Sequence, residues 1–369
     1  MSKCKPVLIL FLGLSACALA WGADAGPEGR RAPAGEPVPA YEQPGPFDVR
    51  VREFPDLKDA KRAGRRVPLK AVYPTGEKAT GPFPLAIFSH GGAGNYDANI
   101  EQAKHLASHG YVVVAPQHVD SDTDRVRHYM SPGGGRMKFW DALNQITIDA
   151  PASLERPRDV SFAIDRALEW NRDDAELKGK IDPEKIGMAG HSYGAYTTLV
   201  ACGAVPMPDH LVPRPKPEDC RGLADARIKA GVAMSPQGKG GVWFDETSFK
   251  EMRVPMLLLT GSKDQLKGPK GEILPPENRR LAFDAMAPGE KHLAWLANVD
   301  HMAFSHNPAA RQLFPSPALE DGQRIAKALT AAFFEAYLKN DARARGCLGA
   351  EYANSLAGKV VDKVEWSRK

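Results

Sequence analysis

The sequence predicts an α/β fold in which helices cover both faces of a mainly parallel β-sheet. The apolar runs at residues 85–89 and 112–115 show no polar alternation, which is typical of strands buried on both faces. Helix-length stretches separate such runs, and alternating strands and helices favour a parallel sheet. The chain has 369 residues, 43% of them hydrophobic and 25% charged, which is the composition of an ordinary globular protein.

The predicted elements follow one another in an order that fits this class. The alternating segments 48–54 and 66–73 predict the first strands. Two stretches interrupt the alternation of strands and helices, residues 120–157 and 203–222. We expect loops or small cap elements there that influence substrate choice. Further strands are expected at residues 185–189, 229–234, 255–260 and 292–299, and helices at residues 99–108, 158–171 and 323–339.

The N-terminal residues 1–25 resemble a secretory signal peptide. Two lysines precede an apolar run over residues 7–20, which is shorter than a membrane-spanning helix and ends in small residues. Two kinds of cleavage remain open. One is a cut after residues 18–20 or 23–25, and the other is a cut before Cys17, because residues 14–17 resemble a bacterial lipoprotein box. We expect an exported protein, periplasmic or secreted, with a membrane tether through Cys17 if the second site is used.

The segments that follow define the expected domain organisation. Residues 26–46 are rich in Gly, Pro and Ala without periodicity, which is typical of a disordered linker. One catalytic domain is expected over residues 47–348, followed by a C-terminal tail at residues 349–369. The formal charge of +4 is spread along the chain with no long basic run, so nucleic acid is not an expected partner.

Three cysteines remain once the N-terminal segment is set aside. Cys202 and Cys220 bracket a proline-rich segment, and Cys347 lies far from both. In an oxidising compartment a disulfide between the first two would close that segment. Two unpaired thiols are the alternative, and the sequence leaves both open.

Residues 190–194 (Gly-His-Ser-Tyr-Gly) form the main candidate catalytic motif of the sequence. They form a G-x-S-x-G pattern between an apolar strand and a helical stretch at residues 195–201, which is the context of a nucleophile elbow. Glycines two positions either side of Ser192 let the chain turn sharply with the hydroxyl exposed. The pattern predicts Ser192 as a nucleophile.

Several segments give the chain a family resemblance. Residues 181–187, which lead into the elbow, are similar to those of bacterial α/β-hydrolases related to dienelactone hydrolase and platelet-activating-factor acetylhydrolase, and so are residues 88–92, 110–116 and 333–341. The resemblance covers residues 47–348, and the family includes cutinase-like polyester hydrolases. It implies the α/β-hydrolase fold, with small cap or loop insertions, and serine-dependent ester hydrolysis through an acyl-enzyme intermediate, with no cofactor.

One departure from the family narrows the expected substrate. Enzymes that open dienelactones carry cysteine at the nucleophile position, whereas this chain carries Ser192. We therefore expect a carboxylic ester, either a small molecule or a lipid, with polyesters and dienelactone-like compounds as alternatives. A peptidase of this kind would usually add a large gating domain, and the chain has no length left for one, so a peptide is not the expected substrate.

A serine hydroxyl needs a base and an orienting acid, and in this fold the chain order is serine, acid, histidine. Asp264 follows the apolar strand 255–260 and is the expected acid. Asp245 lies before that strand and Asp300 adjoins the expected base, so both are weaker candidates.

His301 is the expected base because it follows the next strand, 292–299. His292 lies at the opposite end of that strand, and His306 lies further along the loop. Both are expected to be structural. The histidines His90 and His118 precede the serine and are expected to orient loops or bind substrate. No cluster has the spacing of metal ligands.

Two backbone N–H groups are expected to bind the oxyanion of the tetrahedral intermediate. Tyr193 directly follows the nucleophile, and Gly92 occupies the donor position of a loop that resembles the family's oxyanion loop. Arg158 and Asp159 resemble another family element, which we expect to form a structural ion pair. The competing hypothesis is a catalytically silent exported binding protein, and the presence of candidates for all three catalytic roles argues against it.

Overall fold

The computed structural model of the protein describes residues 39–267 and 272–369. The expected signal peptide at residues 1–25 and the first part of the expected linker lie outside the described residues. Among the helices that the structure describes, none combines the length and the apolar character needed to cross a membrane.

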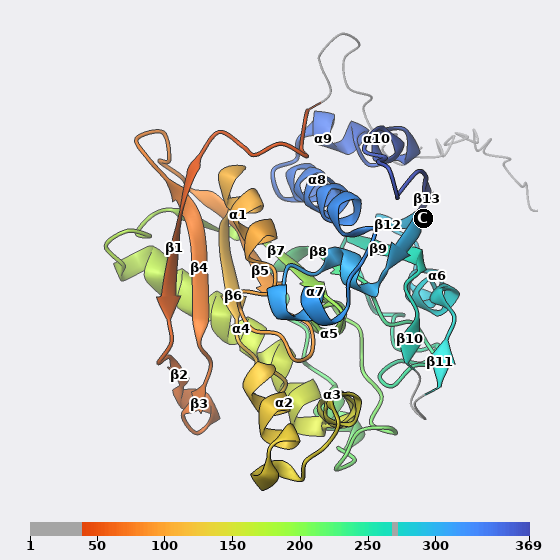
Figure 1. Ribbon diagram of the computed structural model, residues 1–369. Helices are drawn as coiled ribbons and strands as arrows, with labels where there is room; N and C mark the ends of the chain where they lie inside the picture. The colour runs from red at the N-terminus through yellow and green to blue at the C-terminus, as the bar shows by residue number, and fades with distance from the viewer. Residues whose placement is uncertain (1–38, 268–271) are drawn as a thin grey trace, which may run out of the picture. The chain divides into compact units, whose positions relative to one another are not determined.

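A nine-stranded sheet forms the centre of the fold, in the order β1-β4-β6-β5-β7-β8-β9-β12-β13 (Figure 1). The six strands from β6 to β12 in this order run parallel, while β1, β4 and β13 pair antiparallel at the two edges. The strands are β1 (Asp48–Phe54), β4 (Leu69–Thr75), β5 (Phe83–Ser89), β6 (Val112–Pro116), β7 (Ile181–His191), β8 (Ile228–Met234), β9 (Met256–Lys263), β12 (Lys291–Asp300) and β13 (Val364–Arg368). The predicted α/β class with a mainly parallel sheet is confirmed.

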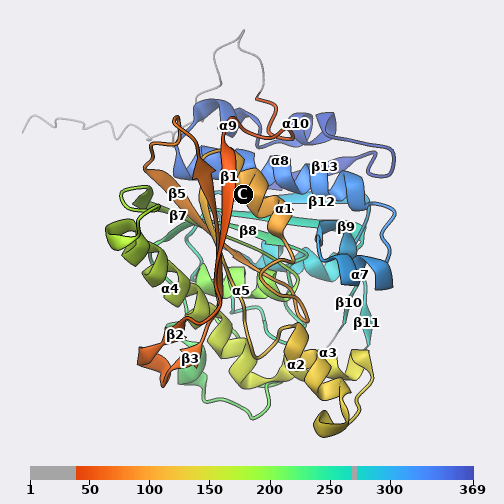
Figure 2. The same cartoon turned by 60° about the vertical axis from the view of Figure 1, so that its left-hand side comes forward.

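Helices cover both faces of the sheet (Figures 1 and 2). On β5, Leu85 and Ile87 face a core shared with α4 (Ala150–Asp173) and α5 (Tyr193–Ala201). The alternate residues of the strand, such as Phe88, face a second core, which is shared with α1 (Ile100–Ser108) and α8 (Leu319–Leu338). Both faces of the central strands are therefore buried, which explains their continuously apolar sequences.

The remaining elements are short. The helices are α2 (Thr123–Met130), α3 (Phe139–Ile148), α6 (Leu281–Ala285), α7 (Pro308–Leu313), α9 (Ala342–Gly346) and α10 (Ala350–Ser355). The 3-10 turns are η1 (Ala60–Arg62), η2 (Pro132–Gly134), η3 (Pro217–Cys220), η4 (Pro276–Arg279) and η5 (His301–Phe304). Two small hairpins pair β2 (Lys58–Asp59) with β3 (Arg65–Arg66), and β10 (Leu266–Lys267) with β11 (Ile273–Leu274).

The segment 120–157 is more helical than the sequence predicts, because it contains α2, α3 and the first turns of α4. Helix α4 begins at Ala150, where the Asp149 side chain accepts a hydrogen bond from the Ala152 N–H at 2.8 Å. Pro157 lies inside this helix and cannot donate to the Ser153 carbonyl one turn earlier. The Tyr196 hydroxyl of α5 donates to that carbonyl instead, at 3.2 Å, so a tertiary contact replaces the lost helical bond.

The expectation of a C-terminal tail at residues 349–369 is wrong. These residues form α10 and β13, and β13 pairs antiparallel with β12. Val364 of β13 is buried, and the Trp366 ring packs edge-on against His292 of β12, with centroids 5.6 Å apart. The alternation of apolar and polar residues in β13 is short and includes charged residues, so its own sequence predicts a strand only weakly. Pairing with β12 stabilises it as a strand.

The three described cysteines, Cys202, Cys220 and Cys347, are buried and unpaired. The loop at residues 203–222 is therefore held by other contacts. Val212 exchanges main-chain hydrogen bonds with the ends of α3 and α4, donating to Ile148 O at 2.7 Å and accepting from Ala150 N at 3.0 Å.

Candidate active site

Three side chains named from the sequence meet at one edge of the sheet. Ser192 follows β7, Asp264 follows β9 and His301 follows β12, and all three strands are parallel. The carboxyl ends of parallel strands lie at the same edge, which is where open α/β sheets bind ligands. The Ser192 Oγ lies 2.9 Å from His301 Nε2, and His301 Nδ1 lies 2.9 Å from Asp264 Oδ1. The geometry is that of a serine, a base and an acid aligned for proton transfer.

The turn that carries Ser192 is sharp and strained. Its φ of 58° and ψ of −118° are rare for a residue with a side chain. A Cβ on Gly190 would lie 2.3 Å from Gly194 O, and a Cβ on Gly194 would lie 2.0 Å from Ser89 O. Both distances are far below contact, so only glycine fits at these positions. The G-x-S-x-G spacing thus follows from the packing of β7, α5 and the end of β5.

The weaker candidates have other partners. Asp300 caps η5 by accepting a hydrogen bond from Met302 N at 2.8 Å, and Asp245 accepts from Thr247 N at 2.7 Å within its own turn. His292 lies near the start of β12, where its Nε2 is 2.8 Å from the Oη of a tyrosine on α8. Burial lowers the pKa of His292 to about 4, so the ring is neutral at pH 7.

Asp264 is fully buried and accepts hydrogen bonds on both carboxylate oxygens. Oδ1 accepts from His301 and lies 2.7 Å from Arg279 Nε, while Oδ2 accepts from the Thr260 hydroxyl at 2.8 Å. Burial alone would raise the pKa of Asp264, but the Arg279 guanidinium and the bond from His301 outweigh burial and hold the pKa well below its usual range. Asp264 is therefore a carboxylate at neutral pH, as an orienting acid must be.

Two further residues near the serine were given no role by the sequence. His191 precedes Ser192, and its Nε2 donates to the His301 carbonyl at 2.9 Å, with the two imidazole centroids 4.9 Å apart. Burial, together with the neighbouring His301, lowers the pKa of His191 to about 3. The buried Gln237 side chain donates to the Ser192 carbonyl at 2.9 Å. Both contacts are to main-chain carbonyls, those of His301 and Ser192, and neither contact follows from a spacing rule.

The glycine loop, which we define as residues 90–94, lies beside Ser192, since a Cβ on Gly91 would lie 3.4 Å from Ser192 Cβ. His90 Nε2 accepts from the His118 N–H at 3.1 Å, so its Nδ1 carries the proton and donates to Gly91 O at 2.7 Å. In a planar trans peptide the C=O and N–H point in opposite directions. The Gly92 N–H is therefore directed away from His90.

The two main-chain donors that the sequence suggests for an oxyanion have no hydrogen-bond partner among the residues that the structure describes. They are the N–H of Gly92 in the glycine loop and the N–H of Tyr193 at the first position of α5. Donors of this kind are what a developing oxyanion requires. A Cβ on Gly92 would lie 3.2 Å from Leu143 and 3.4 Å from Ile146, so α3 packs directly on this part of the loop.

Behind the glycine loop lies a second arrangement of serine, histidine and aspartate. Ser89 Oγ is 2.9 Å from His118 Nε2, and His118 Nδ1 is 3.0 Å from Asp159 Oδ2. All three side chains have no exposed surface. Asp159 also pairs with Arg62 at 2.7 Å and Arg65 at 2.9 Å, so the expected structural ion pair exists, but with these arginines in place of Arg158.

Arg156 links this buried network to the loop. Its guanidinium donates to the Ser89 hydroxyl at 3.1 Å, to the Ser121 hydroxyl at 2.7 Å and to the His90 carbonyl. Its Nε donates to Thr197 of α5 at 2.8 Å. Burial lowers the pKa of Arg156 to about 10, which still leaves it charged at pH 7. A single buried cation thus fixes the glycine loop relative to α5, the helix that follows Ser192.

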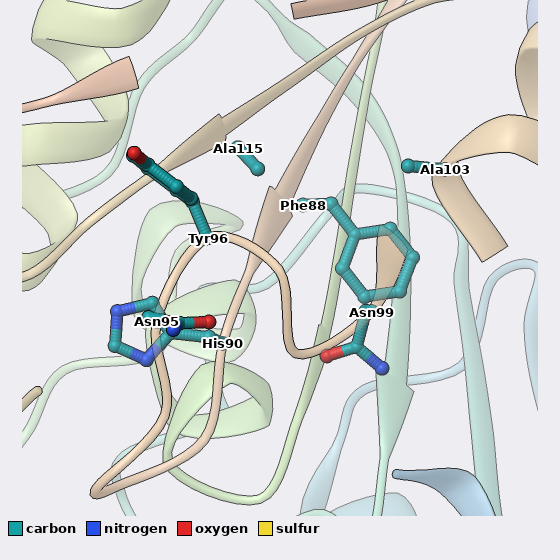
Figure 3. A pocket seen from close by; sticks show the side chains of 7 residues that line it. All are labelled: Phe88, His90, Asn95, Tyr96, Asn99, Ala103 and Ala115. Carbon is teal, nitrogen blue, oxygen red and sulfur yellow. The ribbon is translucent and has the colours of Figure 1, made fainter. Parts of the chain in front are cut away.

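A small cavity lies beside His90, lined by residues that include Phe88, Asn95, Tyr96 and Asn99 (Figure 3). Its volume of about 10 Å³ has room for no more than about one water molecule. An ester substrate cannot enter it. The cavity is therefore part of the packing behind the glycine loop and not a substrate site.

An aromatic patch lies where α3 meets the segment after α7. We define it as Phe139, Trp140 and Phe314, whose ring centroids lie 5.3 to 5.8 Å apart. Trp140 is 49% exposed, and the adjacent Leu313 is 66% exposed. Helix α3 therefore carries exposed apolar surface at its start and, a turn later, packs Leu143 against the glycine loop.

The sheet order and the placement of these side chains at its carboxyl edge define the α/β-hydrolase fold. Residues 65–130 match the family described as "Platelet-activating factor acetylhydrolase, isoform II". The chain is 27% identical to the platelet-activating factor acetylhydrolase of Cavia porcellus over 46% of this chain and 38% of that protein. It is 28% identical to that of Canis lupus familiaris and 27% identical to that of Bos taurus, each over 34% of this chain and 32% of the relative.

These matches confirm the resemblance that the sequence motifs indicate. The chain is an α/β-hydrolase by fold and is similar to platelet-activating factor acetylhydrolases. The matched region spans about a third of the length of these relatives.

Proposed function

We propose that the protein is a serine hydrolase that cleaves carboxylic esters, with Ser192 as nucleophile, His301 as general base and acid, and Asp264 as the orienting acid. The observation that carries the proposal is the pair of 2.9 Å contacts that link the three side chains in this order. Ser192 and His301 are both partly exposed, so a substrate can reach them, whereas Asp264 is buried behind the histidine.

The reaction follows from the positions of these groups. The Ser192 hydroxyl attacks the ester carbonyl while its proton passes to His301 Nε2, and the carbonyl oxygen becomes an oxyanion between the N–H groups of Gly92 and Tyr193. Collapse of the tetrahedral intermediate breaks the ester bond, and His301 returns the proton to the leaving alcohol. A water molecule then attacks the acyl-enzyme by the same proton transfers and releases the acid.

A lipid ester is the substrate class we favour within this reaction. The named relatives are platelet-activating factor acetylhydrolases, and α3 offers apolar surface from Trp140 to Leu143, which packs against the proposed oxyanion loop. An acyl group held at Ser192 would lie close to Leu143, because that side chain contacts Gly92. We therefore infer a preference for a short acyl group on an alcohol with an apolar part.

The test compares wild type and S192A on nitrophenyl esters from acetyl to palmitoyl, and on glycerophospholipids that carry an acetyl or a palmitoyl ester. We expect wild type to cleave the acetyl esters and S192A to lose about 10⁴-fold or more in kcat. Labelling of wild type, but not of S192A, by a fluorophosphonate checks the nucleophile independently of substrate. A wild type that neither cleaves an ester nor reacts with the probe would favour a silent binding protein.

We also propose that the protein is exported. The proposal rests on the sequence of residues 1–25, which lie outside the described residues. Mass spectrometry of the mature N-terminus separates the two cleavage sites, since use of the lipoprotein box leaves a diacylated Cys17 at the N-terminus. A chain that retains Met1 in the cytoplasm would contradict export.

A further inference from the structure

We propose that Arg279 is a positioning residue of the active site, which holds Asp264 and His301 in the geometry needed to accept the proton of Ser192. This inference rests on the esterase function proposed above. Arg279 ends η4, and with 2% of its surface exposed it is, beside Arg156, one of the two largest fully buried side chains of the described residues. A buried guanidinium is costly unless its donors are satisfied, so its contacts identify what it holds.

The first contact is with the proposed acid itself. Arg279 Nε lies 2.7 Å from Asp264 Oδ1, the same oxygen that accepts from His301 Nδ1, and 2.9 Å from the Asp264 main-chain carbonyl. The Thr260 hydroxyl donates to the other carboxylate oxygen. The carboxylate is thus fixed from three directions, which sets the position of His301 opposite Ser192.

The second set of contacts joins two strand ends. Arg279 Nη1 donates to the carbonyls of Ser235 at 2.8 Å and Pro236 at 3.1 Å, which directly follow β8. Its Nη2 donates to the carbonyl of Gln265 at 2.8 Å, just after β9. The planar guanidinium presents five N–H donors in a rigid fork, which the compact ammonium of lysine cannot reproduce. One side chain therefore sets the distance between the loop that follows β8 and the loop that carries the acid.

The third contact places a positive charge beside the base. Arg279 Nη2 lies 3.0 Å from His301 Nδ1. When Nδ1 carries the proton that it donates to Asp264, both atoms are donors, so this contact brings charge near the ring without forming a hydrogen bond. The ionisable groups that face the ring are then Asp264, Arg279 and the neutral His191. One negative and one positive charge therefore lie within 3.0 Å of the same ring nitrogen, and removal of Arg279 leaves only the negative one.

The test compares wild type with R279Q, R279K and the matched control R280Q, on nitrophenyl acetate across pH 4.5 to 9. Arg280 is the next residue along the chain, but its guanidinium lies over the Trp295 ring, 5.3 Å from the ring centroid. We expect R279Q to lose 10-fold to 100-fold in kcat with KM within about two-fold, because small displacements at the reacting groups have effects of this size. The acidic limb of its pH profile should move to higher pH.

The control variants separate charge from geometry. R279K keeps the charge without the fork, so its kcat should fall while the acidic limb moves less than in R279Q, and R280Q should match wild type in both. A folded R279Q with the kcat and pH profile of wild type overturns the proposal, even if its melting temperature is lower. If R279Q is recovered unfolded, R279K decides, and an unchanged kcat in R279K overturns the proposal. A wild type without esterase activity would instead reject the proposed function.

Discussion

Replacing Asp264 by asparagine should impair activity and stability for two separable reasons. The amide has the shape of the carboxylate but no charge, so His301 loses the partner that fixes its tautomer, and kcat/KM should fall about 10⁴-fold. The same change leaves the Arg279 guanidinium buried without its counter-ion, which lies 2.7 Å away in the wild type. Breaking one side of a buried pair costs about 3–5 kcal/mol, so D264N should lose that much free energy of unfolding.

A second substitution separates the two effects. In the double variant D264N/R279M both charges are gone, so the penalty of an unpaired charge disappears, although the carbonyls that Arg279 bonds lose their donors. The double variant should therefore lose about 3 kcal/mol less free energy of unfolding than D264N and R279M lose together as single variants. Its kcat/KM should stay as low as that of D264N. Urea unfolding and nitrophenyl acetate hydrolysis measure the two quantities. Additive stability losses, within about 0.5 kcal/mol, would refute the electrostatic coupling of Asp264 and Arg279.

Three further predictions follow from the same geometry. G194A should lose more than about 3 kcal/mol of stability and all fluorophosphonate labelling, because its Cβ would lie 2.0 Å from a carbonyl of β5, whereas G133A, with nothing nearer than 4.0 Å, should change stability by less than about 0.5 kcal/mol. L143A should shift the preferred acyl length of nitrophenyl esters upward, because it removes the side chain packed against Gly92, and an unchanged chain-length profile would contradict this. The pKa of Asp264 is lowered on folding, so its contribution to stability is complete above the unfolded pKa of about 4 and is lost progressively as the pH falls from there toward the folded value. The free energy of unfolding in urea should therefore fall more steeply from pH 5 to pH 3 in wild type than in D264N. Parallel slopes would exclude this contribution.

The sequence was sufficient to name the three residues that the structure brings together, for a physical reason. A parallel sheet places the carboxyl ends of its strands at one edge, so a polar residue directly after each apolar run, such as Asp264 or His301, is directed to a common place. The glycine spacing around Ser192 adds a local signal, because the elbow excludes any Cβ at those positions. Both signals are periodic or local and can therefore be read from one chain.

Other features depend on contacts that a single sequence does not reveal. Arg279 reaches the site from a short 3-10 turn with no periodicity, and nothing in its neighbours distinguishes it from the exposed arginines of the chain. The helix expected at residues 158–171 begins already at Ala150 and runs through Pro157, and the Tyr196 hydroxyl supplies the hydrogen bond that the proline cannot make. The expected tail at residues 349–369 becomes part of the sheet because β12 offers an unpaired edge.

The buried arrangement of Ser89, His118 and Asp159 provides, within the same molecule, a serine whose reactivity can be compared with that of Ser192. Its two contacts, at 2.9 and 3.0 Å, join the same types of atoms at nearly the same distances as the contacts between Ser192, His301 and Asp264. Ser89 lies in a regular strand with no exposed surface, whereas Ser192 lies on a strained turn beside two unpaired N–H groups. A template search that scores only distances between side chains would select both serines. The ratio of their modification rates in one molecule therefore reflects access, backbone strain and the additional hydrogen bond from Arg156 to Ser89, since the serine–histidine–aspartate contacts are the same.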